Sequence, residues 1–175
     1  MLSFLGIPFK VVVPNISEAQ YTGESPRSFC LRISKEKVSA VGLQYSDALI
    51  IGADTIVVIN GTILGKPHDY DEAIEYLKLL QNKVHDVLTG YTIALGARSV
   101  SKVVRTRVTF RAMTAEEIKW YVSTGEPMDK AGAYAVQGIA SMFINRIHGC
   151  YTNVIGLPLS HLYRDLTKFG IQVST

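Results

Sequence analysis

The sequence contains little cysteine and no large excess of charge of either sign. Cys30 and Cys150 are the only two cysteines among 175 residues. They lie far apart, so we expect free thiols in a reducing cytoplasm rather than a disulfide framework. No Cys-x-x-Cys pair or Cys/His cluster is present, which argues against a structural zinc site. The net charge of +3 is too small for a dedicated nucleic-acid binder but is compatible with an anionic small-molecule ligand.

Long apolar runs and several familiar catalytic motifs are also missing. No stretch approaches the roughly 18 apolar residues of a membrane-spanning helix, so no membrane association is expected. The first four residues, Met1-Leu2-Ser3-Phe4, have neither a basic region nor a long apolar region, which predicts no signal peptide. The absence of Gly-x-x-x-x-Gly-Lys-Ser/Thr excludes a P-loop nucleotidase. The four histidines share no ligand spacing, and we expect them at the surface or in loops.

Composition and periodicity predict a globular, mixed α/β protein. Hydrophobic residues make up 47% and charged residues 19% of the chain, and the length favours one domain, residues 1–175. Alternating or apolar β-rich patterns predict strands at residues 9–13, 48–59, 62–64, 87–95 and 103–111, and an extended stretch at 133–147. Helical spacing, capping residues and terminal glycines predict helices at residues 26–43, 70–81, 114–125 and 157–170.

Lys37 interrupts the apolar face of the first predicted helix. At about 100° per residue, Lys37 falls inside the arc that contains Ile33 and Val41, whereas Lys35 points to the other side. A lysine in that position either extends its ammonium to water at the rim of the core or meets a buried anion. Lys37 is therefore a candidate phosphate ligand, with a snorkelling lysine as the alternative.

Asp54 interrupts an apolar run in the strand predicted at residues 48–59. An unpaired carboxylate is costly to bury, so Asp54 needs a cation, a metal or several hydrogen bonds. The alternative is an aspartate that caps a turn at the end of the strand. Gly52, two residues earlier, leaves room for a ligand or for a close approach of backbone.

Asn60-Gly61 connects a third residue to this aspartate. The dipeptide predicts a two-residue hairpin, in which the numbers of opposing residues sum to 121, so that Lys66 lies opposite Thr55. Lys66 is then either an exposed lysine at a strand end or, through a bulge at Gly65 or an end-on approach, a second cation beside Asp54. Two lysines at one carboxylate suggest a site where lysines hold phosphate and the carboxylate holds Mg²⁺ or activates water.

Seven motifs occur in a fixed order along most of the chain: Gly52-Ala-Asp-Thr55, Asn60-Gly61, Gly65-Lys-Pro67, Leu88-Thr-Gly90, Gly125-Glu-Pro127, Asp129-Lys-Ala-Gly-Ala-Tyr-Ala-Val-Gln-Gly138 and Asn153-Val-Ile-Gly-Leu-Pro158. With these motifs the sequence resembles the Maf family of nucleoside triphosphate pyrophosphatases. The resemblance implies an elongated, two-lobed α/β fold of the inosine triphosphatase-like type, with a mixed sheet and with the substrate in a central cleft. Residues 129–138 are similar to the branch of the family that acts on dTTP and UTP.

The resemblance also implies roles for individual residues. Asp54 matches the catalytic acidic residue, Lys37 and Lys66 match phosphate-binding lysines, Gln137 matches a polar active-site position, and Glu18 matches an acidic residue near the metal. The implied cofactor is Mg²⁺ or Mn²⁺, bound by Asp54 and Glu18. A cytoplasmic homodimer is the expected state, from the family and from the frequency of symmetric dimers.

One family feature is missing from residues 1–175. Members resembling this sequence carry Ser-x-Ser-Pro-Arg-Arg about a dozen residues before Leu-Gly-Ile-Pro-Phe, but here Met1 stands four residues before Leu5. The missing arginines would bind triphosphate oxygens bidentately, which lysines do not reproduce. We expect either a truncated or misassigned start, without the family's first strand and much of the helix that follows it, or a degenerate relative.

The resemblance therefore implies two possible functions. The first is a metal-dependent pyrophosphatase that removes unusual or excess pyrimidine nucleotides from the nucleotide pool. The alternative, which the missing arginines favour, is a non-catalytic nucleotide-binding regulator of cell division and septum formation.

Overall fold

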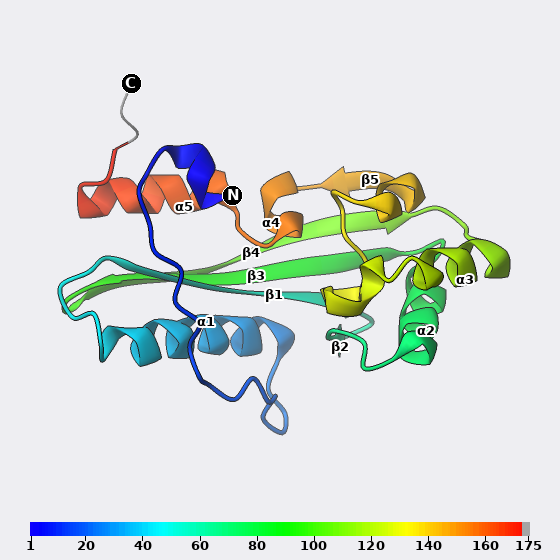
Figure 1. Ribbon diagram of the computed structural model, residues 1–175, viewed down its shortest axis with the longest axis horizontal. Helices are drawn as coiled ribbons and strands as arrows, with labels where there is room; N and C mark the ends of the chain where they lie inside the picture. The colour runs from blue at the N-terminus through cyan, green and yellow to red at the C-terminus, as the bar shows by residue number, and fades with distance from the viewer. Residues whose placement is uncertain (173–175) are drawn as a thin grey trace.

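The computed structural model describes residues 1–172, and residues 173–175 of the predicted domain lie outside the described residues. The structure is mixed α/β, as predicted (Figure 1). Its helices are α1 (Pro26–Gly42), α2 (Tyr70–Leu80), α3 (Ala115–Ser123), α4 (Tyr151–Ile155) and α5 (Leu159–Leu166), with 3₁₀ turns η1 (Leu2–Leu5), η2 (Glu126–Asp129), η3 (Ala131–Ala133), η4 (Ile139–Phe143) and η5 (Thr167–Phe169). Its strands are β1 (Ile50–Ile59), β2 (Thr62–Leu64), β3 (Val84–Leu95), β4 (Arg98–Phe110) and β5 (Ile144–His148). No helix within residues 1–172 is both long and apolar enough to cross a bilayer.

The strands form one sheet in the order β2-β1-β3-β4-β5. All of its pairings within residues 1–172 are antiparallel, so the mixed sheet that the resemblance implied is wrong. Asn60 and Gly61 adopt positive φ angles of 51° and 82° and form the predicted two-residue turn between β1 and β2. Val57 pairs with Leu64, as the predicted sum of 121 requires. The β1–β2 ladder ends at this pair, because β2 is only three residues long.

Helix α1 packs directly on one face of the sheet. Ser25 caps its N-terminus by accepting a hydrogen bond from the amide of Ser28, and Pro26 occupies the first turn, as predicted. A Cβ at Gly52 would lie 2.7 Å from the carbonyl oxygen of Ser34, and a Cβ at Gly90 would overlap the backbone of Cys30. These glycines therefore allow the helix backbone to approach the sheet. Of the two roles expected for Gly52, room for a ligand or a close approach of backbone, the structure shows the close approach.

The opposite face of the sheet is covered by α5 and by η1 (Figure 1). Leu162 and Leu166 of α5 pack with Tyr91 of β3 in a buried apolar cluster. Gly170, with a φ of 80°, ends the helical segment after η5, as predicted. The middle of β1 is therefore covered on both faces, as predicted from its apolar run. We call α1, α5 and the part of the sheet between them the α1 lobe.

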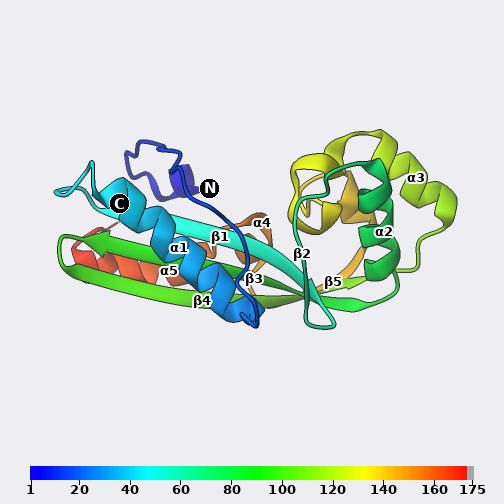
Figure 2. The same ribbon diagram turned by 90° about the horizontal axis from the view of Figure 1, so that it is seen from below.

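The second lobe, here called the α2–α3 lobe, consists of α2, α3, η2 to η4 and β5 (Figure 2). Its core is formed around the buried rings of Phe110, Tyr121 and Phe143. Thr114 and Glu117 form the predicted capping box at the start of α3. The far ends of β3 and β4 extend into this lobe, so the sheet is shared by both lobes.

Two predicted elements are wrong. Residues 9–13 are not a strand: Val11 and Val13 are 75% and 88% exposed, and within residues 1–172 no strand of the sheet pairs with this segment. Residues 133–147 are not continuously extended, because η3 and η4 interrupt the segment before β5. The partly buried Glu126 carboxylate accepts hydrogen bonds from the amides of Ile139 and Ala140, which favours a turn over a strand there.

Candidate functional site

Lys37 of α1 and Asp54 of β1 form a largely buried ion pair. The distance from Lys37 Nζ to Asp54 Oδ1 is 2.8 Å, and the two side chains are 19% and 10% exposed. Asp54 points to the α1 face of the sheet, on the same side as Gly52, because side chains alternate along a strand. Of the two arrangements expected for Lys37, the structure has the one in which the ammonium meets a buried anion.

Glu18 reaches the same lysine from the segment before α1. Its Oε1 lies 2.9 Å from Lys37 Nζ, while its side chain remains 54% exposed. Lys37 therefore bridges two carboxylates, one buried and one open to solvent. We call Glu18, Lys37 and Asp54 the charged triad.

Burial and charge shift the pKa values of two members of the triad. Burial raises the pKa of Asp54 above its usual value, although the hydrogen bond and charge of Lys37 act in the opposite direction. For Lys37, burial alone would lower the pKa, but hydrogen bonds to Asp54 and Glu18 outweigh it and the net pKa is raised. Asp54 is consequently a stronger base than an exposed aspartate, and Lys37 stays protonated.

Lys66 follows β2 and does not pair with Thr55 in the ladder. The carbonyl oxygen of Gly65 accepts a hydrogen bond from the amide of Gly132, so the chain turns away from β1 toward η3. The predicted pairing of Lys66 with Thr55 is therefore wrong. Lys66 is nevertheless close enough for its charge to lower the pKa of Asp54 against the larger effect of burial.

Lys66, Thr55 and Gln137 line one cavity of about 250 Å³, which lies between β1 and the irregular segment of residues 129–137. The other lining residues are Val57, Val87, Asp129, Lys130, Ala131, Tyr134, Ala135, Val136, Val154 and Ile155. Thr55 faces the side of the sheet opposite Asp54, where its hydroxyl is hydrogen bonded to Thr89 and to the carbonyl of Gly156. The predicted site residues therefore form two groups, the charged triad and the cavity, separated by the edge of β1.

The edge of β1 is open between the two groups. One edge of β1 pairs with β3, and the other edge pairs with β2 only from Val57 to Ile59. On that second edge, in the described part of the chain, no strand lies beside residues 50–56. An elongated ligand could pass around this edge and contact the cavity with one end and the triad with the other. No hydrogen bond joins Lys66 or Gln137 to the triad within residues 1–172.

Sequence reasoning did not select three residues of this cavity, Thr55, Asp129 and Lys130, as site residues. Asp129 and Lys130 form an ion pair at the cavity wall. The signal was present, because both residues belong to the motif of residues 129–138. Nothing in the local pattern indicated that η2 would place them beside Lys66.

His85 corrects the expectation that all histidines lie at the surface. Its side chain is 2% exposed. Its Nε2 lies 2.9 Å from the hydroxyl of Tyr134, and its ring packs edge-on against Phe110 and Tyr134. Burial lowers the pKa of His85 to about 4. The imidazole is therefore a neutral core residue behind the cavity wall.

The family described as Maf-like protein matches residues 1–169. The chain belongs to the Maf family. This confirms the resemblance inferred from the ordered motifs, and the two-lobed α/β structure agrees with the fold class that the resemblance implied. The Maf family match includes the charged triad and every residue that lines the cavity.

Relatives of the Maf chain are similar over almost its whole length. The dTTP/UTP pyrophosphatase of Syntrophomonas wolfei is 44% identical over 175 residues, which cover 99% of this chain and 93% of the relative. That of Symbiobacterium thermophilum is also 44% identical over 175 residues, with 100% and 90% covered. That of Bacillus cereus strain B4264 is 42% identical over 174 residues, with 99% and 91% covered.

Proposed function

We propose that this protein hydrolyses dTTP and UTP to the nucleoside monophosphate and pyrophosphate. The observation that carries the proposal is the buried Lys37–Asp54 pair at the open edge of β1. It provides a base and a fixed positive charge in a chain whose full-length relatives are named dTTP/UTP pyrophosphatases. Removal of unusual or excess pyrimidine nucleotides is the corresponding cellular role.

The reaction uses Asp54 and Lys37 in different ways. Asp54 accepts a proton from water, whose oxygen forms a bond to the α-phosphorus while the bond to the bridging α–β oxygen breaks. The raised pKa of Asp54 supports this role, because a base is most effective when its pKa is closer to the working pH. Lys37 stays protonated and offsets the negative charge that develops on the phosphates.

Lys66 binds the phosphates from the cavity side. Lys66 lines the cavity, and its charge lowers the pKa of Asp54. A triphosphate that follows the open edge of β1 therefore contacts both Lys66 and the charged triad. As a flexible point charge, Lys66 is suited to a phosphate whose position changes during the reaction.

The residues present fit Mg²⁺ or Mn²⁺ as a cofactor. Magnesium in nucleotide sites is held by one or two carboxylates together with substrate phosphates, and Glu18 and Asp54 are two carboxylates that share Lys37. The bound ion would supply charge neutralisation at the phosphate oxygens. Within residues 1–172 no group of three or more His, Cys, Asp or Glu side chains is arranged for a metal, so substrate phosphate and water would have to supply the remaining ligands.

Gln137 contacts the base in this proposal. Its amide carries both a donor and an acceptor, which match the edge of uracil or thymine, and it lies in the cavity opposite the triad. A contact to phosphate and a purely structural role in the turn before Gly138 are the alternatives. Gln137→Glu should reduce activity on every triphosphate, because it removes the amide donor and adds negative charge. Gln44→Glu, in the exposed turn that follows α1, should not reduce activity.

Pyrophosphate release from eight nucleotides, the four common ribonucleoside and four deoxyribonucleoside triphosphates, tests the function in the presence of Mg²⁺. We expect dTTP and UTP to be the best substrates. A ranking led by purines would contradict the base assignment. Binding of dTTP without pyrophosphate release would instead favour the non-catalytic regulator of cell division.

A cytoplasmic homodimer completes the proposal. Both cysteines are free thiols, Cys30 buried and Cys150 partly buried, which supports a reducing compartment. Symmetric dimers are the commonest oligomers of soluble proteins. Sedimentation velocity at several concentrations tests the dimer, and a monomer at all of them would contradict it.

A further inference from the structure

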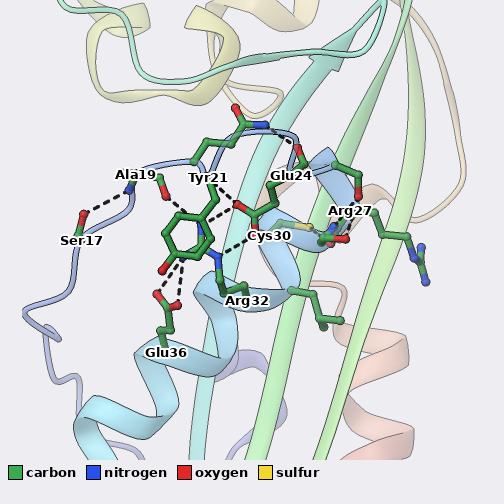
Figure 3. Close-up of polar contacts among 12 residues, drawn as sticks. Ser17, Ala19, Tyr21, Glu24, Arg27, Cys30, Arg32 and Glu36 are labelled. Carbon is green, nitrogen blue, oxygen red and sulfur yellow. Dashed lines mark hydrogen bonds and ion pairs between the residues drawn. The ribbon is translucent and has the colours of Figure 1, made fainter.

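Arg32 lies one helical turn before Glu36 on α1 and makes an unusually complete set of contacts (Figure 3). Its Nε and Nη2 each donate a 2.7 Å hydrogen bond to the carboxylate of Glu24. Nη2 also donates to the carbonyl oxygen of Ala19 at 2.9 Å, and Nη1 donates to both carboxylate oxygens of Glu36 at 3.1 Å. The guanidinium carbon lies 3.9 Å from the centre of the Tyr21 ring.

Most of these contacts reach one irregular segment, residues 17–24, which precedes α1. Ala19, Tyr21 and Glu24 all belong to it, and Ala19 directly follows Glu18 of the charged triad. Apart from the Glu18–Lys37 ion pair, the hydrogen bonds and ion pairs that join this segment to α1 within residues 1–172 all end on Arg32.

Glu24 also organises the segment internally. Its carboxylate accepts a hydrogen bond from the amide of Tyr21, and its carbonyl accepts one from the side chain of Gln20. Arg32 and Glu24 are 18% and 10% exposed at their side chains, so their contact is largely shielded from water. A bidentate arginine–carboxylate pair of this kind fixes direction as well as distance.

Glu18 has little else to hold it in place. Its side chain is 54% exposed, and an exposed ion pair by itself contributes little stability. The segment has no helix or strand of its own. The position of Glu18 beside Lys37 therefore depends on whatever anchors the backbone next to it.

We propose that Arg32 is a positioning residue, which anchors residues 19–24 on α1 so that Glu18 stays in contact with Lys37. This inference rests on the proposed function for its effect on turnover, but the contact itself can be tested without activity. Arg32 touches neither Lys37 nor Asp54, so its influence on the charged triad passes through the segment.

The first experiment is a zero-length cross-link by carbodiimide, which joins a carboxylate to a lysine in contact with it. Mass spectrometry then measures the Glu18–Lys37 product relative to the Asp54–Lys37 product in the same sample. Arg32→Gln should lower this ratio at least fivefold, and Arg32→Lys less. An unchanged ratio would overturn the proposal whether or not the protein is active.

Glu24 and Glu36 provide matched variants, because both contact Arg32 but only Glu24 belongs to the segment. Glu24→Gln should lower the cross-link ratio severalfold, and Glu36→Gln should leave it unchanged. If Arg32→Gln fails to fold, this pair still decides the question. Equal effects of Glu24→Gln and Glu36→Gln would mean that Arg32 only stabilises α1 and would overturn the proposal.

The second experiment is a double-mutant cycle on turnover. Arg32→Gln should lower kcat on the order of tenfold with little change in KM, since a displaced catalytic-site group commonly costs tenfold or more. In a Glu18→Gln background it should cause no further loss. Fully additive losses would contradict the route through Glu18. If the wild-type protein releases no pyrophosphate, the proposed function fails and the cross-link ratio alone decides the role of Arg32.

Discussion

The α1 lobe and the α2–α3 lobe hold their site residues in different ways. In the α1 lobe, Lys37 and Asp54 stand on a regular helix and strand and are largely buried. In the α2–α3 lobe, Lys66 and Gln137 stand on irregular backbone between elements and are exposed. In the proposed function this difference corresponds to two tasks: the α1 lobe fixes charges for chemistry, and the α2–α3 lobe forms a surface for the nucleotide.

Changing Asp54 should produce the largest effect, because it removes the proposed base from the α1 lobe without altering the shape of the side chain. We expect Asp54→Asn to lower kcat about 10³-fold, within the usual range for loss of a general base. The amide oxygen can still accept the hydrogen bond from Lys37, so the melting temperature should change little. Steady-state kinetics check the prediction, with Asp47→Asn in the exposed turn before β1 as a control. Retention of more than about a tenth of kcat, only ~1.4 kcal/mol of barrier, would exclude Asp54 as the catalytic carboxylate.

Acid should destabilise the α2–α3 lobe through His85. Its pKa of about 4 in the folded protein lies below the ordinary value of 6.5, so the unfolded chain binds the extra proton first as pH falls. Stability is therefore full above pH 6.5 and decreases as pH falls toward 4, by about 3 kcal/mol in total.

His85→Gln should flatten this dependence, because glutamine does not titrate and can still bond to the Tyr134 hydroxyl. Urea unfolding at a series of pH values measures the free energy of unfolding of the wild type and of His85→Gln. Above pH 7 the wild-type imidazole is neutral in both the folded and the unfolded state, so a difference between the two proteins there reports the effect of the substitution on packing. An equal slope in both proteins would show that other groups cause the acid sensitivity.

Gly90→Ala should disturb the α1 lobe alone. The added Cβ would overlap the backbone of Cys30, so α1 must move away from the sheet, at a cost of about 2 kcal/mol for overpacking. Because α1 carries Lys37, kcat should fall together with stability. Gly42→Ala is the control: its Cβ would make an ordinary 3.7 Å contact with Ile50. Loss of stability with unchanged kcat would mean that the Lys37–Asp54 pair tolerates the shift.

The smallest effect is expected for Lys66. Lys66→Met should weaken dTTP binding about tenfold, or ~1.4 kcal/mol, and leave thymidine binding nearly unchanged, because Lys66 is assigned to phosphate. Lys37→Met should show the same preference but should also destabilise the fold, since it leaves Asp54 buried without its partner. Titration calorimetry with both ligands measures the difference. Equal losses of affinity for nucleotide and nucleoside would mean that Lys66 shapes the pocket and does not bind phosphate.

Local sequence patterns predicted much of the α1 lobe. The Asn60-Gly61 turn fixed the β1–β2 register, the Ser25-Pro26 start placed α1, and the helical arc put Lys37 on the face that meets Asp54. Each of these rests on neighbours within a few residues or on one helix face. The sequence alone was therefore enough to predict the β1–β2 register, the start of α1 and the side of the helix on which Lys37 lies.

The α2–α3 lobe was less predictable, because its structure depends on contacts between distant residues. The turns of residues 131–143 follow from Glu126 binding the amides of Ile139 and Ala140. The burial of His85 depends on Phe110 and Tyr134, which lie far along the chain. Likewise, the β-branched run of residues 9–13 predicted a strand, but a strand needs a neighbouring strand to pair with, and the local pattern does not specify one.

The β3–β4 hairpin has a consequence for how nucleotide is admitted. Its two strands are paired along the whole length of β3, from Val84 to Leu95, and run through both lobes without a break. Rigid-body closure, in which two lobes rotate about a few connecting residues, would have to bend this continuous ladder. Admission of nucleotide is therefore expected to involve residues 17–24 and the turns around Gln137 rather than hinge motion, and the radius of gyration in solution scattering should stay nearly constant when dTTP binds.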